Sequence, residues 1–263
     1  MIPALPLAED TWRWATLAHL ALLLAMLAAP LLDHRVLDGA NVWVKPAKFA
    51  FALAVHFLVL TWVVSTLSAP WRGGSFLAIV ALVSTFAAGG EMLYIGVQAA
   101  RQAHSHFNLS TPIYQLLYQL MALGAVLIIG GAGVLGVVAA VDREAALVPT
   151  VRAGVVLGLV GGTALTLISA FTMGARLDHH VGVEAAGAPR MPLTGWSLSV
   201  GDLRVSHFLA THMIQAVPLV GLVASRLPTV IGVPLVVVAA VAWTAATLGA
   251  WRGALDGRPP LTP

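Results

Sequence analysis

Apolar residues run in long blocks along this chain, separated by polar or turn-rich breaks such as Asp142-Arg143-Glu144 and Arg226-Leu227-Pro228. Crossing the bilayer core of about 30 Å takes about 20 helical residues, and seven of the blocks are that long. The pattern therefore predicts an all-α integral membrane protein, a seven-transmembrane-helix bundle that forms a single membrane domain. The expected helices cover residues 11–32, 46–67, 75–100, 113–141, 151–174, 205–225 and 229–251.

The composition supports a membrane protein. Hydrophobic residues make up 59% of the chain and charged residues 10%, whereas about a quarter of the residues in a soluble domain are charged. Cysteine is absent, which excludes disulfides, thiolate catalysis and iron–sulfur ligation by cysteine. The net charge of +3 is spread over several loops, so nucleic acid is not an expected partner. We expect a multi-pass protein of the cell (inner) membrane that contacts membrane lipid; no pattern specifies an oligomeric state.

The polar residues of the loops favour one side of the membrane. The loops after the first, third and fifth predicted helices are the richest in polar residues, and an odd number of spans places them with the C-terminus. Nine of the 14 basic residues lie on this side, which favours a cytoplasmic location. The fifth loop, at residues 175–204, is apolar enough to predict a lid, with Asp202 as the cap of the next helix.

Polar side chains form a stripe along one face of each of three predicted helices, within about 80° at 100° per residue. The stripes contain Lys45, Lys48 and His56 on the second helix, Glu91, Tyr94, Gln98 and Arg101 on the third, and Arg204, His207, Thr211 and Gln215 on the sixth, with His212 beside the last stripe. At 1.5 Å per residue, His56, Glu91 and His212 lie roughly 12–17 Å below the basic residues of their helices. We therefore expect these three side chains to converge near the bilayer midplane.

Two imidazoles and a carboxylate are ligands that suit zinc or a non-haem iron. The leading hypothesis is a metal-dependent membrane enzyme, with His56, His212 and Glu91 as ligands and Glu91 and His207 as catalytic groups. The basic rim indicates an amphipathic, anionic substrate such as a lipid-like or isoprenoid-like molecule. The residues expected to surround this substrate are Lys45, Lys48, Tyr94, Gln98, Arg101, Tyr118, Gln119, Arg204, Thr211 and Gln215.

The positions of His56, Glu91 and His212 resemble those of the zinc ligands in the seven-helix amidohydrolases of the alkaline ceramidase and adiponectin-receptor group. The resemblance implies a zinc hydrolase. The chain departs from that group because its histidine pair, His207 and His212, lies on the sixth helix, and because Ala52 stands where the group has a serine.

Two alternatives use the same residues. In a b-type cytochrome, His56 and His212 would be the axial ligands of haem b, the basic rim would bind the propionates, and a quinone would be the redox partner. In a proton-coupled transporter, Glu91 and the histidines would form a proton relay. The loop pairs His104/His106 and His179/His180 are interpreted as solvated, and Gly154, Gly158 and Gly162 as a helix-packing face.

Overall fold

The computed structural model describes residues 7–260, and 72% of the chain is helical. Seven helices in this described part are long and apolar enough to cross a membrane, which confirms the prediction of an all-α, multi-pass protein. They are α1 (Ala8–Ala28), α2 (Val44–Ser65), α4 (Ser75–Ala100), α5 (Pro112–Val141), α6 (Pro149–Arg176), α7 (Leu203–Ala224) and α8 (Thr229–Leu255). The shorter elements are the 3-10 turn η1 (Ala29–Leu31), α3 (Ala69–Arg72), and the strands β1 (Val36–Leu37), β2 (Ala40–Asn41), β3 (His180–Val181) and β4 (Gly201–Asp202).

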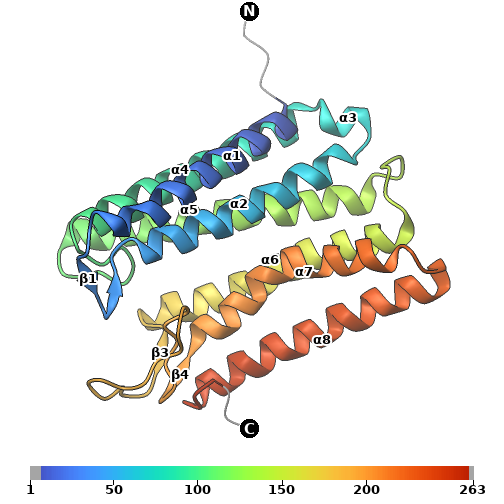
Figure 1. The fold of residues 1–263 in the computed structure, drawn as a ribbon. Coiled ribbons are helices and arrows are strands. Elements are labelled where there is room, and N and C mark those ends of the chain that lie inside the picture. Colours follow the sequence, from blue (N-terminus) through green and yellow to red (C-terminus); the bar gives the residue numbers. More distant parts are fainter. Residues whose placement is uncertain (1–6, 261–263) are drawn as a thin grey trace, which may run out of the picture. The chain divides into compact units, whose positions relative to one another are not determined.

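The chain divides into two compact units, which meet in sequence between Ala146 and Leu147. The N-terminal unit contains α1 to α5 and the C-terminal unit contains α6 to α8 (Figure 1). Each unit buries its own apolar core.

Helices α1, α2, α4 and α5 form the N-terminal unit. The fully buried Trp12 of α1 donates a hydrogen bond from its indole N–H to Ser84 of α4, with 3.0 Å between Nε1 and Oγ. Thr111 caps α5 by accepting the Tyr114 N–H, as expected for a threonine before a proline at the first helical position. The α1–α2 and α4–α5 loops meet, because Arg35 donates to the Ala100 carbonyl at 2.9 Å. Within this unit, the two loops therefore lie on one side, as predicted.

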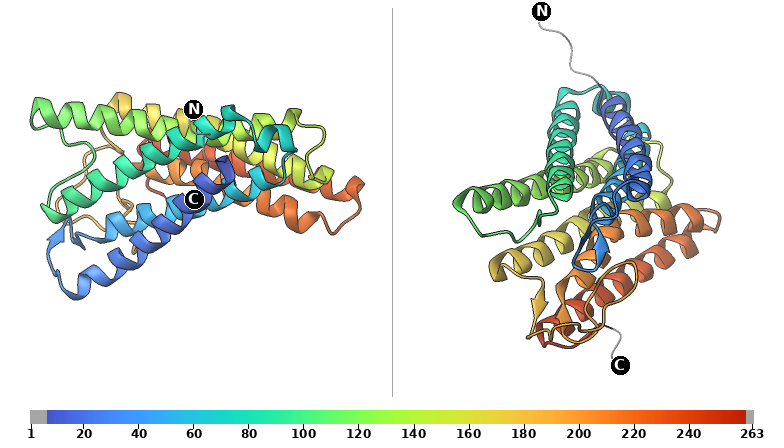
Figure 2. Two further views of the ribbon diagram at one scale, coloured as in Figure 1. Left: turned by 90° about the horizontal axis from the view of Figure 1, so that it is seen from above. Right: turned by 60° about the vertical axis from the view of Figure 1, so that its left-hand side comes forward.

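Helices α6, α7 and α8 lie side by side in the C-terminal unit (Figures 1 and 2). Gly154, Gly158 and Gly162 of α6 face α7 so closely that a Cβ atom at any of the three would lie within 3.0 Å of an α7 atom. The predicted packing role of these glycines is confirmed.

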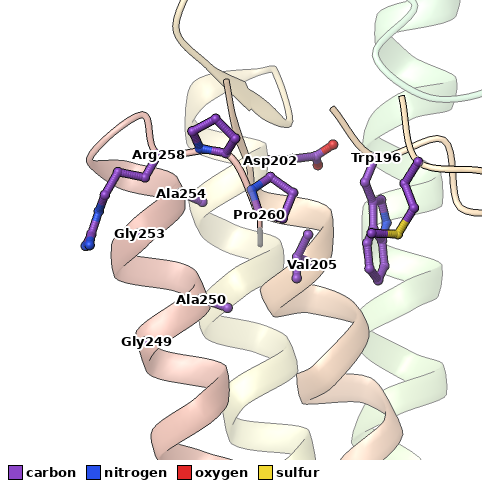
Figure 3. Close-up of a pocket in the computed structure, with 11 residues that line it drawn as sticks. Trp196, Asp202, Val205, Gly249, Ala250, Gly253, Ala254, Arg258 and Pro260 are labelled. Carbon is purple, nitrogen blue, oxygen red and sulfur yellow. The ribbon is translucent and has the colours of Figure 1, made fainter. Parts of the chain in front are cut away.

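The long α6–α7 connection folds back on its own unit. Strands β3 and β4 pair antiparallel, with His180 opposite Asp202, and Asp202 caps α7 by accepting the Arg204 N–H. Gly201 packs against the backbone of Ala254, near the end of α8. Figure 3 shows Trp196, Asp202 and Arg258 around a pocket of about 290 Å³ at this end of the unit. The connection thus covers the ends of α7 and α8, whereas its action as a lid over a substrate cleft stays a prediction.

Candidate functional site

Several ionisable or strongly polar side chains are buried inside the N-terminal unit. His19 on α1, His56 on α2, and Glu91 and Gln98 on α4 are each at most 6% exposed. Three of their atoms are buried without a hydrogen-bond partner in the described part of the chain: Nε2 of His19, Nε2 of His56 and Oε1 of Glu91. Buried polar atoms normally have partners. These three atoms are therefore the positions in this unit at which a new hydrogen bond or coordination bond would most stabilise a bound molecule or ion.

Glu91 lies on the wall of an apolar groove between α4 and α5. The groove has a volume of about 680 Å³, and Glu91 is its only ionisable carboxyl among the described lining residues. Gly124 of α5 makes room for this side chain, because a Cβ atom at position 124 would lie 3.0 Å from Oε1 of Glu91. The other lining residues are apolar apart from Tyr94 and include Leu82, Phe86, Leu117, Leu120 and Leu127.

The two buried histidines of this unit share one aromatic neighbour. The ring centroid of Phe57 lies 5.4 Å from those of His19 and His56. Nδ1 of His19 lies 2.7 Å from the Ala15 carbonyl, and His56 forms a hydrogen bond with the backbone of Ile128 on α5. Ile128 follows Gly124 by one helical turn. His56 and Glu91 thus approach α5 at positions one turn apart, and so at similar depths.

A line of polar contacts runs from the Glu91 level of α4 to the α4–α5 loop. Gln98 donates from its side-chain amide to the Tyr94 hydroxyl at 3.2 Å and to the His104 carbonyl at 3.1 Å. Arg101, at the end of α4, donates to the Tyr114 hydroxyl at 3.1 Å. Tyr94, Gln98 and Arg101 thus connect the groove to the polar end of the unit.

The other predicted rim residues of the N-terminal unit are more peripheral. Lys45 is half-buried in the first turn of α2, and Lys48 is exposed one turn later. The ring of Tyr118 packs against Phe107 at 5.4 Å between centroids, and Gln119 is exposed on α5.

The α7 stripe lies in the C-terminal unit and contacts α6. Nδ1 of His207 lies 3.0 Å from Oγ of Ser169. Thr211 accepts from Thr166 at 3.5 Å, and Oε1 of Gln215 is buried without a partner in the described chain. His212 stacks on the exposed Phe208, with ring centroids 3.9 Å apart.

Arg204, predicted as part of the rim, binds within its own unit. Its guanidinium contacts both carboxylate oxygens of Asp202 and donates to the Gly195 carbonyl at 2.8 Å. The bond to Arg204 is one of the contacts that hold the pKa of the Asp202 carboxyl below its usual range, against the opposing effect of burial. The positive charge of Arg204 is thus balanced before any substrate binds.

No known family model matches this chain, and no curated protein or solved structure matches it either. His56 and Glu91 belong to the N-terminal unit and His207 and His212 to the C-terminal unit, so their convergence on one centre stays a prediction.

The sequence interpretation of His179 and His180 as solvated is wrong, because their side chains are only 22% and 14% exposed. Together with Asp178 they form a polar cluster in the α6–α7 connection. Asp178, His179 and His180 follow α6 directly, and one potential ligand atom from each lies within 4.8 Å of the other two. Burial, together with the charge of Arg204, lowers the pKa of His179 to about 4. Glu184 lies four residues after His180, and both side chains are mostly buried. The signal available in the sequence was the run Asp-His-His, followed by a glutamate.

Proposed function

We propose that this protein is a membrane enzyme acting on an amphipathic, anionic, lipid-like or isoprenoid-like molecule, and that Glu91 exchanges a proton with that molecule. The supporting observation is the buried Glu91 carboxyl on the wall of the apolar α4–α5 groove. An ionisable side chain deep in a membrane costs about 2.5–3.5 kcal/mol on insertion scales. A bound polar group that hydrogen-bonds to Oε1 offsets this cost.

The groove suits the apolar part of such a molecule. Its volume of about 680 Å³ falls within the usual range for small-molecule pockets, roughly 300–1,000 Å³. Leucine, valine and phenylalanine side chains from α4 and α5 dominate its lining, so an isoprenoid or acyl chain can lie along the two helices.

Arg101 is suited to the charged end of the molecule. A guanidinium binds carboxylates and phosphates through paired hydrogen bonds. The Arg101 guanidinium donates to the Tyr114 hydroxyl, which does not balance its positive charge. Arg101 follows Glu91 by ten residues, which corresponds to about 15 Å along a helix. We expect the substrate to have an anionic head at this distance from its reacting group.

Metal dependence is a second part of the proposal. Zinc or iron held by His56, Glu91 and His212 would act as a Lewis acid and lower the pKa of bound water. The buried Nε2 atom of His56 supports this ligand role, and His207, beside Ser169, would be an additional base. This metal site requires His56 and Glu91 of the N-terminal unit and His212 of the C-terminal unit to reach the same ion.

One observation favours a haem with His19 in place of His212, the partner of His56 in the sequence prediction. Both His19 and His56 have a buried Nε2 atom without a hydrogen-bond partner in residues 7–260, and both rings contact Phe57. Two imidazoles from neighbouring helices are typical axial ligands of haem b. An absorbance spectrum of the purified protein tests this alternative. A Soret band would support a cytochrome, and the absence of a Soret band would refute it.

Two glycine substitutions on α5 provide a matched test of the groove. Gly124→Leu fills the space beside Glu91, whereas a Cβ atom at Gly130 meets no described atom within 4 Å. Each protein is purified in detergent, and the lipids that copurify are measured by mass spectrometry. We expect an anionic amphipathic species enriched over bulk membrane lipid in the wild type and in Gly130→Leu, and at least tenfold depleted in Gly124→Leu.

A Glu91→Gln variant tests the chemistry separately from binding. Glutamine has the shape of glutamate but cannot act as a general acid–base group at this position. The variant should therefore retain a copurifying molecule in a form that differs chemically from the one found with the wild type. Equal lipid content in wild type and Gly124→Leu would refute the groove, and an identical molecule in wild type and Glu91→Gln would refute the proton exchange. Elemental analysis without zinc or iron would refute the metal part alone.

A further inference from the structure

The α6–α7 connection begins with three potential metal ligands held close together. Oδ1 of Asp178 lies 3.6 Å from Nδ1 of His179 and 4.0 Å from Nδ1 of His180. Both separations exceed a hydrogen bond, which spans about 2.7–3.2 Å. Two ligands on one tetrahedral zinc ion, with bonds of about 2.0–2.1 Å, lie about 3.3 Å apart. Contractions of about 0.3 and 0.7 Å would bring these two pairs to that separation. One ligand atom of each of the three residues already lies within 4.8 Å of the other two.

The surroundings of His180 orient its ring for this role. Nε2 lies 3.8 Å from Oδ2 of Asp202 and 3.9 Å from Oε2 of Glu184, and it has no hydrogen-bond partner in the described chain. Two carboxylates on this side favour the proton on Nε2, which leaves the lone pair of Nδ1 directed to the Asp178 side. A carboxylate behind a histidine is the common arrangement around protein-bound zinc.

The backbone fixes this arrangement. His180 donates its N–H to Oδ1 of Asp178 at 3.0 Å, and the β3–β4 pairing places His180 opposite Asp202. Asp202 is bound to Arg204, and Glu184 to Arg190. These two carboxylates thus compensate the charges of the two arginines, and both lie within 4 Å of Nε2 of His180.

We propose that the α6–α7 connection binds a divalent transition metal ion, with Asp178, His179 and His180 as its ligands. Two imidazoles and one carboxylate suit zinc best among the common metal ions, with an open position for water. The three ligands lie just beyond the C-terminus of α6, whose carbonyl groups carry partial negative charge. All three ligands belong to the C-terminal unit, so this site does not depend on the function proposed for Glu91.

Cobalt is the probe for this site, because its visible absorption reports coordination by the protein. The full-length protein, purified with an affinity tag that contains no histidine, is treated with a chelator and titrated with Co²⁺. We expect this site to add one saturable equivalent of Co²⁺, reversed by an equimolar amount of Zn²⁺, to any ion that His56, Glu91 and His212 bind. The double variant His179→Gln/His180→Gln should bind at least 100-fold more weakly.

The matched control is His104→Gln/His106→Gln, which removes the other histidine pair from a loop of the N-terminal unit. This control should bind cobalt like the wild type, and Glu184→Gln should weaken binding about tenfold while keeping one equivalent. Asp178→Asn, whose side chain is 57% exposed, replaces the double variant if that protein does not fold. The site would be overturned if the wild type bound no cobalt. It would also be overturned if the variant without His179 and His180, or the variant without the Asp178 carboxylate, bound cobalt as strongly as the wild type.

Discussion

Gly158 is the position where substitution should reveal most clearly how closely α6 and α7 pack. A Cβ atom at Gly158 would lie 2.4 Å from Cδ of Pro218 and 3.1 Å from the Met213 carbonyl oxygen. Ordinary carbon–carbon contacts are about 3.5–4.0 Å, so the helices must separate locally by about 1 Å. Overpacking of this kind costs about 1–3 kcal/mol, while alanine gains up to about 1 kcal/mol over glycine in helix propensity. We expect Gly158→Ala to lower the free energy of unfolding by about 1–2 kcal/mol.

The measurement is thermal unfolding in detergent, followed by tryptophan fluorescence. For a domain of roughly 100 residues, a loss of 1 kcal/mol lowers the melting temperature by about 4 °C or more. Gly174→Ala is the control on the same helix, because a Cβ atom there meets no atom of residues 7–260 within 4 Å. The control should melt at or above the wild-type temperature. A melting temperature of Gly158→Ala as high as that of Gly174→Ala would show that α6 and α7 do not pack this closely.

Two further predictions concern the N-terminal unit. Trp12→Phe removes the indole donor to Ser84 and should lower the free energy of unfolding by about 1 kcal/mol, measured by thermal unfolding. The same change at Trp14, which is 67% exposed, should lower it little. Equal losses in the two variants would contradict the buried hydrogen bond of Trp12. Hydrogen bonds from Arg35 and Trp43 hold the pKa of Asp33 well below its usual range. The ionised Asp33 carboxylate therefore stabilises the fold above its unfolded pKa of about 3.9, and this stabilisation is lost as the pH falls through the lower folded pKa. Asp33→Asn should therefore speed hydrogen exchange in the β1–β2 hairpin at pH 7, and the difference from wild type should vanish only in strong acid.

The helices could be predicted closely because membrane length and hydropathy are properties of a single segment. Residues 75–100 were predicted as one span and form α4. The first span ends as an α-helix at Ala28, four residues before the predicted end, because the 3-10 turn Ala29–Leu31, which contains Pro30, follows it. The Tyr94–Gln98 hydrogen bond likewise follows from the i, i+4 spacing on one helix face.

The residues of the α6–α7 connection could not be placed in this way. His180 is mostly buried because its strand pairs with a segment 22 positions later in the sequence, a contact that no periodic pattern predicts. Arg204 was assigned to a substrate rim because it lies at the start of α7. Its binding to Asp202 follows from the conformation of the helix cap, which hydropathy does not specify.

The glycines of α5 and α6 look alike in the sequence but have different physical roles. At Gly158 and Gly162, an added Cβ atom would meet backbone atoms of α7 as well as side chains, and only movement of a helix relieves such contacts. At Gly124, the Cβ atom would meet the end of the Glu91 side chain, which can rotate away at small cost. Substitution of Gly124 should therefore change where the Glu91 carboxyl points more than how the helices pack. For this reason Gly124→Leu reports on ligand binding beside Glu91, whereas substitution of Gly158 reports on the packing of α6 against α7.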